Sequence, residues 1–162
     1  MWISRTGTHS TRPWKGDRGD TNILVYAADA DSPWHIEARE WIEQRRNRPD
    51  AWDVTWSILY EFLRVTTHPR VMRKPWTATK AMGFVTALLG SPGLWVLVAT
   101  DRHVAVATRV IAELPWLSGN LLHDAHTAIL MREHGVTRIC TRDTDFRRFP
   151  FLEVVDPSSE RR

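Results

Sequence analysis

From Asp20 onward, short apolar runs alternate with longer segments whose apolar residues recur at helical spacing. The short runs are typical of strands and occupy Trp52–Trp56, Leu94–Ala99, Thr137–Thr141 and Leu152–Val155. The longer segments predict helices over Pro33–Arg46, Thr77–Leu89, Arg102–Leu114 and Leu121–His134, with one more helix after Ser57, which we expect to cap it. Strands separated by helices in this order predict an α/β domain of three layers, α/β/α, with a mainly parallel central sheet.

Size, cysteine content and charge exclude several classes of protein. A chain of 162 residues suits one domain with an ordinary hydrophobic core. Cys140 is the only cysteine, which excludes an internal disulfide and a cysteine-based zinc cluster. The longest apolar runs, such as Leu94–Ala99, are too short for a membrane helix, and the N-terminal residues lack a secretory signal. We therefore expect a cytoplasmic protein with no membrane partner.

The net charge of +3 comes from residues 1–19, because the rest of the chain carries equal numbers of basic and acidic side chains. Overall basicity is therefore weak evidence for a nucleic-acid partner, and only local basic clusters are informative.

Acidic residues recur just after the expected strands or near the starts of the expected helices. They are Asp20, Glu61, Asp124, Asp143 and Asp145. Because the carboxyl ends of parallel strands meet at one edge of a sheet, these side chains can converge there. Carboxylates crowded in one crevice need a cation to stay ionised, and oxygen ligands favour Mg²⁺ or Mn²⁺. Three of them also have a purely structural interpretation: Asp20 and Asp143 suit helix caps, and the helix dipole favours Asp124.

Four blocks of sequence resemble the signature blocks of PIN-domain proteins, in the order of that family. The blocks are Asp20–Ala27 (DTNILVYA), Tyr60–Arg64 (YEFLR), His123–Ala128 (HDAHTA) and Thr141–Phe146 (TRDTDF). They look most like those of VapC-like ribonuclease toxins of type II toxin–antitoxin systems. The resemblance runs from Asp20 to about Val155, and four blocks in register are far more specific than any one of them.

The resemblance implies a Mg²⁺-dependent endoribonuclease that dimerises and is neutralised by a cognate antitoxin. Carried over residue by residue, it implies an acidic site of Asp20, Glu61, Asp124 and Asp143, with Asp20 and Asp124 as the direct metal ligands. Asp145 is a second candidate for the fourth position. The resemblance also assigns supporting roles to Asn22 and Thr141, and it makes Thr21–Ala28 a helix where composition alone favours a strand.

One basic loop and several aromatic residues bear on RNA binding. Arg70, Arg73 and Lys74 lead into Trp76, and a cation beside an aromatic ring is a surface that holds single strands. The alternative is a solvated loop with Trp76 tucked under the next helix. Arg64 either reaches a phosphate of the RNA or pairs with a carboxylate of the site. The remaining expectations are structural: a core or interface position for Trp34, Trp41, Trp52, Trp56 and Trp95, a buried Cys140, and packing or hydrogen-bonding roles for His123 and His126.

The residues before Asp20 depart from the family pattern. In the family the first aspartate ends a buried apolar strand, whereas here it follows Trp14–Gly19 (WKGDRG). A central strand of this sequence would bury unpaired charge, so we expect a defective first strand. We interpret residues 1–19 as a disordered or aberrant segment that replaces a lost apolar strand, residues 20–156 as the PIN domain and 157–162 as a tail. An apolar run in place of Lys15–Gly19 should then stabilise the chain.

The altered first strand leaves a second hypothesis beside the endoribonuclease toxin. It is an inactive PIN-fold binding module that engages an antitoxin or a second copy of itself. A third hypothesis, a metal-dependent phosphohydrolase of another α/β family, requires a nucleophilic Asp-x-Asp after an apolar strand. Asp20-Thr21-Asn22 lacks the second acid.

Overall fold

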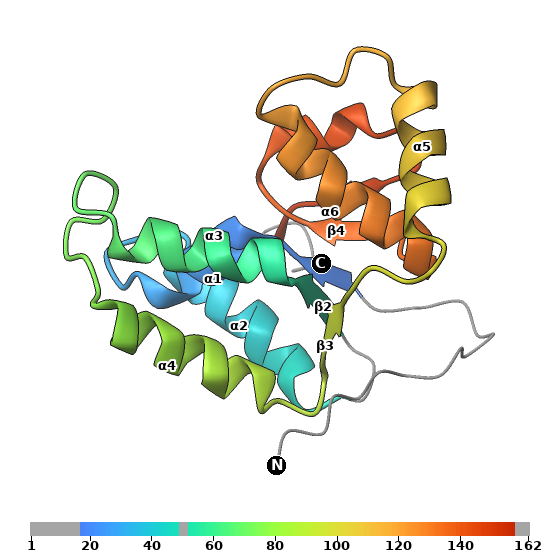
Figure 1. Cartoon of the computed structure of the whole chain (residues 1–162). Helices are drawn as coiled ribbons and strands as arrows, with labels where there is room; N and C mark the ends of the chain where they lie inside the picture. Colours follow the sequence, from blue (N-terminus) through green and yellow to red (C-terminus); the bar gives the residue numbers. More distant parts are fainter. Residues whose placement is uncertain (1–16, 49–51, 158–162) are drawn as a thin grey trace.

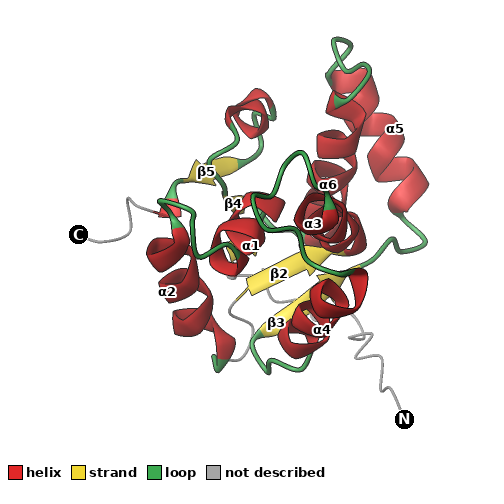
Figure 2. Ribbon diagram, turned by 90° about the vertical axis from the view of Figure 1, so that its left-hand side faces the viewer, coloured by secondary structure: helices red, strands yellow, loops and turns green. Residues whose placement is uncertain are grey.

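The computed structural model of the chain describes residues 17–48 and 52–157. These residues form a parallel sheet of five strands in the order β3-β2-β1-β4-β5 (Figure 1 and Figure 2). The strands are β1 (Asp17–Gly19), β2 (Trp52–Thr55), β3 (Leu94–Leu97), β4 (Arg138–Cys140) and β5 (Glu153–Val155). Every pairing between neighbouring strands is parallel, which confirms the α/β architecture expected from the alternation of apolar runs and helices.

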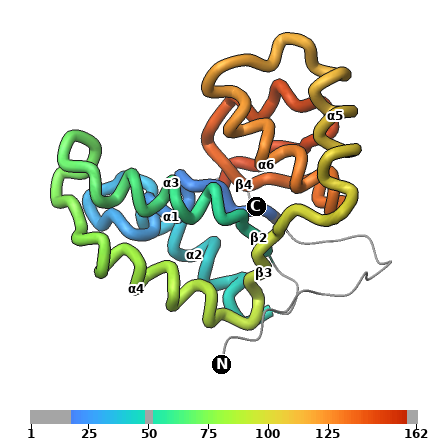
Figure 3. The backbone as a smooth tube through the Cα atoms, viewed as in Figure 1, coloured from blue at the N-terminus to red at the C-terminus, as the bar shows by residue number. Residues whose placement is uncertain are grey.

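Helices cover both faces of the sheet, which gives the three layers (Figure 1 and Figure 3). The first face carries α1 (Thr21–Ala28), α2 (His35–Arg46), α3 (Trp56–Thr67) and α4 (Ala78–Leu89), and the second carries α5 (His103–Glu113), α6 (Leu121–His134) and the short 3-10 helix η1 (Thr144–Arg148). The core divides in the same way, with Trp52 and Phe62 in one hydrophobic cluster and Met131 and Ile139 in the other. None of the described helices is both long and apolar enough to span a membrane.

Capping residues set several of the helix ends. Oγ1 of Thr55 accepts a hydrogen bond from the backbone N–H of Ile58, so α3 begins at Trp56, and Thr55 caps it where we expected Ser57. Gly135 has a φ of 72°, in the left-handed region that glycine favours, and it ends α6. Thr21–Ala28 is helical, as the family resemblance implied.

Strand β1 lies in the middle of the sheet, between β2 and β4, despite its charged sequence. Arg18 is fully buried, and its Nε donates a 2.6 Å hydrogen bond to Oδ1 of Asp53 in β2, which is also fully buried. Gly19 follows it, and a Cβ at this position would lie 3.0 Å from the Trp52 ring, closer than is usual, so the ring would have to shift.

The formation of β1 corrects the expected start of the folded domain. Asp17–Gly19 belong to the sheet, whereas we expected the domain to begin at Asp20 and its first strand to be defective. The reasoning from sequence missed the partner of Arg18, a carboxylate 35 residues later. Residues 1–16 and 158–162, which hold most of the predicted N-terminal segment and tail, lie outside the described residues.

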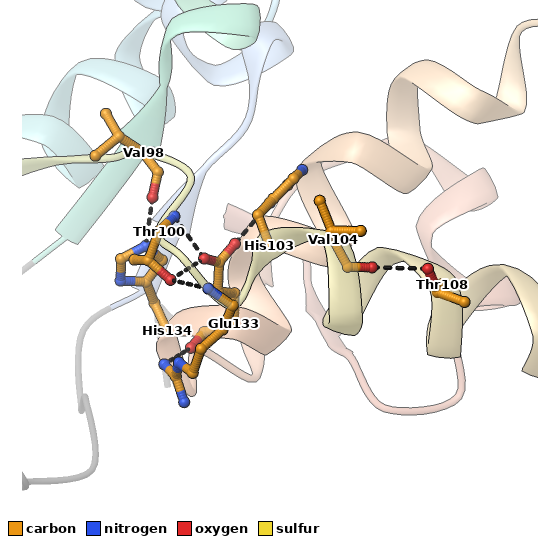
Figure 4. Close-up of polar contacts among 8 residues, drawn as sticks. Val98, Thr100, His103, Val104, Thr108, Glu133 and His134 are labelled. Carbon is orange, nitrogen blue, oxygen red and sulfur yellow. Dashed lines mark hydrogen bonds and ion pairs between the residues drawn. The ribbon is translucent and has the colours of Figure 1, made fainter.

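On the second face, the buried carboxylate of Glu133 ties α6 to the connection between β3 and α5 (Figure 4). It accepts hydrogen bonds from the backbone N–H and the hydroxyl of Thr100, and from Nδ1 of His103 at 2.7 Å. Burial raises the pKa of this carboxyl group, but the hydrogen bonds from Thr100 and His103 outweigh burial and lower it overall. Glu133 therefore stays ionised, and this network fixes the start of α5 against the end of α6.

Candidate active site

Asp20 stands at the carboxyl end of β1, immediately before α1, and is only 7% exposed. Thr141, which follows β4, donates from Oγ1 to Oδ2 of Asp20 at 2.6 Å. Nδ2 of Asn22 donates to the same carboxylate oxygen at 3.0 Å and to Oγ1 of Thr141 at 2.7 Å. The fold thus brings Asn22 and Thr141 onto the carboxylate that the sequence analysis expected them to support.

The first turn of α6 places Asp124 near this carboxylate. Burial raises the pKa of Asp20 to about 6. The pKa of Asp124 is also raised to about 6, first by burial and then by the negative charges of Asp143, Asp20 and Asp145. Arg18 and His123 offset only part of this effect, so negative charge accumulates at this edge of the sheet.

Asp143 and Asp145 follow β4 at the same edge. The backbone N–H of Asp143 donates to Oγ1 of Thr141 at 2.9 Å, and Oδ1 of Asp143 accepts a 2.9 Å hydrogen bond from the backbone N–H of Asp145. Asp143 therefore caps η1, which was its structural interpretation, and it also raises the pKa values of Asp20 and Asp124. Asp145 is exposed, and its charge raises the pKa of Asp124 but is not among the causes of the shift at Asp20.

Glu61 lies in α3 and is engaged by Arg64, one turn later. Nε and Nη2 of Arg64 donate to the two oxygens of Glu61, at 2.8 and 2.5 Å. This hydrogen bonding lowers the pKa of Glu61, and the charge of His123 in α6 lowers it further. Of the two interpretations of Arg64, the structure shows the pairing with a site carboxylate. Glu61 is not among the charges that raise the pKa values of Asp20 and Asp124.

The side chains at this edge fit a hard divalent cation. The described part of the chain holds no group of three or more His, Cys, Asp or Glu side chains placed to bind one metal ion. Mg²⁺, however, is usually bound through one or two carboxylates and completes its octahedron with water and substrate phosphate. Asp20 and Asp124 are the two carboxylates at this edge that would hold such an ion. Oδ1 of Asn22 is buried and has no hydrogen-bond donor within the described residues, which leaves one more oxygen beside Asp20 for such a ligand shell.

The residues predicted to bind RNA lie in α3 and after it. Arg70, Arg73 and Lys74 are exposed, and Nζ of Lys74 lies 3.8 Å from Asp31. The ring of Trp76 packs edge-on against Phe62 and Phe84, with centroids 6.3 and 5.9 Å apart, and Lys80 lies over the ring. The indole is thus partly tucked against the hydrophobic core.

The sequence analysis did not single out a stacked pair at this same edge. The guanidinium of Arg142 lies over the ring of Trp34, 3.6 Å from its centroid. The sequence signal that was overlooked is the position of Arg142 between Thr141 and Asp143. The ring of His126, by contrast, contacts that of His103 from an exposed position, and partial burial lowers the pKa of His126.

Comparison with known proteins assigns the chain to a family. The PIN domain family profile matches residues 20–152, nearly the whole described chain. This chain belongs to the PIN-domain family. Ribonuclease VapC48 of Mycobacterium tuberculosis is 31% identical over 140 residues, which covers 86% of this chain and 96% of that protein. Ribonuclease VapC33 of the same species is 32% identical over 141 residues, covering 87% and 97%.

Solved structures of PIN-domain toxins share the fold. Mycobacterium tuberculosis VapC20, a toxin that cleaves the sarcin-ricin loop, superposes with a TM-score of 0.62 at 19% identity, over 86% of this chain and 98% of that one. VapBC2 from Rickettsia felis, bound to a DNA fragment from its promoter, gives a TM-score of 0.59 at 16% identity, over 86% and 96% of the two chains. The five-stranded parallel sheet of the described residues is therefore the PIN-like fold.

Proposed function

We propose that this PIN-domain protein is an endoribonuclease toxin of the cytoplasm that hydrolyses RNA phosphodiester bonds with Mg²⁺ as its cofactor. The observation that carries the proposal is the placement of Asp20, buried at the carboxyl edge of the sheet and held by Thr141 and Asn22, with Asp124 in the first turn of α6 near it. Relatives that match this chain over most of its length are named ribonucleases, which supports RNA as the substrate.

Asp20 and Asp124 would hold the cation, and Mn²⁺ is the natural substitute. The chemistry that such an ion would supply is a lower pKa for a water molecule and neutralisation of charge on the phosphate. Attack of water in line with the departing 3′-oxygen would leave 5′-phosphate and 3′-hydroxyl ends. Thr141 and Asn22 hold one oxygen of Asp20 and so fix the direction in which the other points. Asp143, with Asp145 as the alternative fourth acid, adds negative charge beside them.

Glu61 would act as a hydrogen-bond acceptor toward water or the RNA. The pairing with Arg64 keeps the pKa of Glu61 low, so the carboxylate is ionised at neutral pH. The side chain of Arg64 is 61% exposed and that of Glu61 is 42% exposed, so substrate can reach the pair. Arg64, Arg70, Arg73 and Lys74 are candidates for contacts with the RNA backbone, with Trp76 beside the last three.

The decisive experiment is RNA cleavage by the purified chain, with and without Mg²⁺. We expect cleavage of total RNA that requires the ion and that Asp124→Asn abolishes. Asp101→Asn is the matched control, because Asp101 is an exposed aspartate outside the acidic site. Equal cleavage by Asp124→Asn and the parent would refute the site. If the parent neither cleaves RNA nor binds Mg²⁺, the inactive binding module is the better account.

We further propose that a cognate antitoxin neutralises the protein. Structural relatives were solved as VapBC complexes, in Rickettsia felis and in Salmonella typhimurium. The partner to test is the small protein encoded in the same operon. Stoichiometric addition of it should stop RNA cleavage, and continued cleavage in a saturated complex would contradict neutralisation.

A homodimer is the third part of the proposal. Trp56 is 43% exposed and Tyr60 67% exposed, and their rings lie side by side on α3 with centroids 6.1 Å apart. Val98 and Val104, on the β3–α5 connection and α5, are also exposed. Large apolar side chains exposed together favour association. Light scattering should give twice the chain mass for the parent and less for Tyr60→Glu; equal masses would contradict this interface.

A further inference from the structure

Trp34 and Arg142 form a stacked pair at the edge of the sheet that carries the acidic residues. Trp34 directly precedes α2, and Arg142 lies between Thr141, which orients Asp20, and Asp143. The guanidinium carbon is 3.6 Å from the centroid of the indole ring. Nη1 of Arg142 also lies 3.1 Å from Oδ1 of Asp156, which follows β5. The indole and the carboxylate together hold the guanidinium in one orientation.

Trp34 and Asp156 do not fully enclose the Arg142 side chain. The Arg142 side chain is 26% exposed. Within the described part of the chain, the ion pair with Asp156 and the stack on Trp34 are the interactions found for it. Its Nε and its Nη2 make no hydrogen bond within the described residues and can serve a ligand.

We propose that Arg142, held flat on Trp34, stacks against the base of the nucleotide next to the scissile phosphate. The inference rests on the proposed ribonuclease function, because the acidic residues mark where that phosphate lies. RNA bases unstacked from their neighbours are commonly bound on aromatic rings and on arginine planes. A guanidinium already fixed by an indole loses little conformational entropy when a base stacks on it.

The charges around the site support the same conclusion. Four aspartates at this edge repel a polyanion, so RNA needs a cation close to them. Arg18 is fully buried, so the cations near this edge that can reach RNA are Arg64 and Arg142, and Arg142 lies within one residue of both Thr141 and Asp143. Arg142 and Trp34 thus supply both the charge and the flat surface that single-stranded RNA requires.

Binding measurements on a chain that cannot cleave test the contact directly. The probe is a short fluorescein-labelled single-stranded RNA, titrated in Mg²⁺ with the Asp124→Asn protein. Adding Arg142→Met should weaken binding roughly 10-fold, the size expected for one stacked base. Arg142→Lys keeps the charge but loses the plane, and we expect nearly the same loss. Arg45→Met is the matched control, because Arg45 stacks on Trp41, 4.3 Å from its centroid, on α2.

Three results would overturn the proposal. If Arg142→Met binds the RNA as tightly as the parent, Arg142 does not contact the RNA. If Arg142→Lys binds the RNA as tightly as the parent, the contact is ionic and stacking is excluded. An equal loss in Arg45→Met shows a general effect of removing a surface arginine. Melting curves recorded beside each titration show whether a variant is folded, and Arg142→Lys keeps the test valid if Arg142→Met is not.

Cleavage kinetics then locate the base. In an oligonucleotide that spans a mapped cut, an abasic residue next to the cut should raise KM about 10-fold for the parent. It should have no further effect in Arg142→Met, because the stacked contact is already lost. Fully independent effects would refute the assignment. A parent that cleaves no RNA would refute the proposed function, whereas the binding comparison still decides the role of Arg142.

Discussion

The ion pair between Arg18 and Asp53 replaces the apolar side chains that a central strand normally presents to a parallel sheet. Both side chains are fully buried, and Nη1 of Arg18 has no hydrogen-bond acceptor among the described residues. Burial lowers the pKa of Arg18, and the neighbouring charge of Asp53 opposes that shift. The two buried charges therefore compensate each other.

Removing one partner of a buried ion pair typically costs about 3–5 kcal/mol, because the other charge stays buried without compensation. We expect that loss in the free energy of unfolding for Arg18→Met and for Asp53→Leu. Replacing both with apolar residues of similar total volume is typically neutral or stabilising by about 1–4 kcal/mol. The double variant should therefore be at least as stable as the parent.

Urea unfolding of the parent, the two single variants and the double variant, followed by tryptophan fluorescence, closes a double-mutant cycle. A strong favourable coupling between the two substitutions is the expected result. Additive effects, or an Arg18→Met variant as stable as the parent, would show that Arg18 and Asp53 do not form this pair. An apolar first strand alone removes Arg18, the buried ion-pair partner of Asp53, so we now expect it to destabilise the chain, the reverse of the expectation from sequence.

Four further outcomes are expected. The raised pKa of about 6 for Asp20 and Asp124 means that the native state binds more protons than the unfolded chain between about pH 4 and pH 6, where unfolded aspartate titrates near 3.9. The free energy of unfolding of the metal-free protein should therefore fall as the pH rises through this window, by up to about 3 kcal/mol for buried Asp20; a rise with pH would contradict the acidic cluster. Asp124→Asn should stabilise the metal-free protein at pH 7 by about 1 kcal/mol, since Asp124 is only half-buried, and equal or lower stability in urea would count against its assignment. Millimolar Mg²⁺ should raise the melting temperature of the parent and of Asp101→Asn but not that of Asp124→Asn, and identical shifts in all three would place the ion elsewhere. Thr77→Ala removes the hydroxyl that accepts from the backbone N–H of Lys80 at the start of α4, and urea unfolding should show a loss of about 1 kcal/mol; no loss would mean that this cap contributes nothing.

The order of strands and helices after Asp20 was predictable because it depends on local periodicity. Leu121–His134 reads as a helix with Gly135 after it, and the structure ends α6 at that glycine. Thr21–Ala28 was harder, since eight mostly apolar residues show no decisive period, and only the resemblance to a family made it a helix. We predicted the position of the acidic residues for a different reason. Parallel strands bring their carboxyl ends to one edge, so residues that follow strands meet there without any knowledge of side-chain contacts.

Contacts between residues far apart in the chain depended on the fold. A charged β1 looked incompatible with a central strand until the register of β1 and β2 placed Asp53 beside Arg18. From sequence, Arg64 could reach either an RNA phosphate or a carboxylate of the site. Its spacing of three residues from Glu61 in α3 places the two side chains in contact. The stack of Arg142 on Trp34 joins the loop after β4 to the start of α2. Sequence patterns report which residues repeat along one element. Pairing of buried charges and stacking of rings depend instead on distances across the folded molecule, which are set when separate elements pack together.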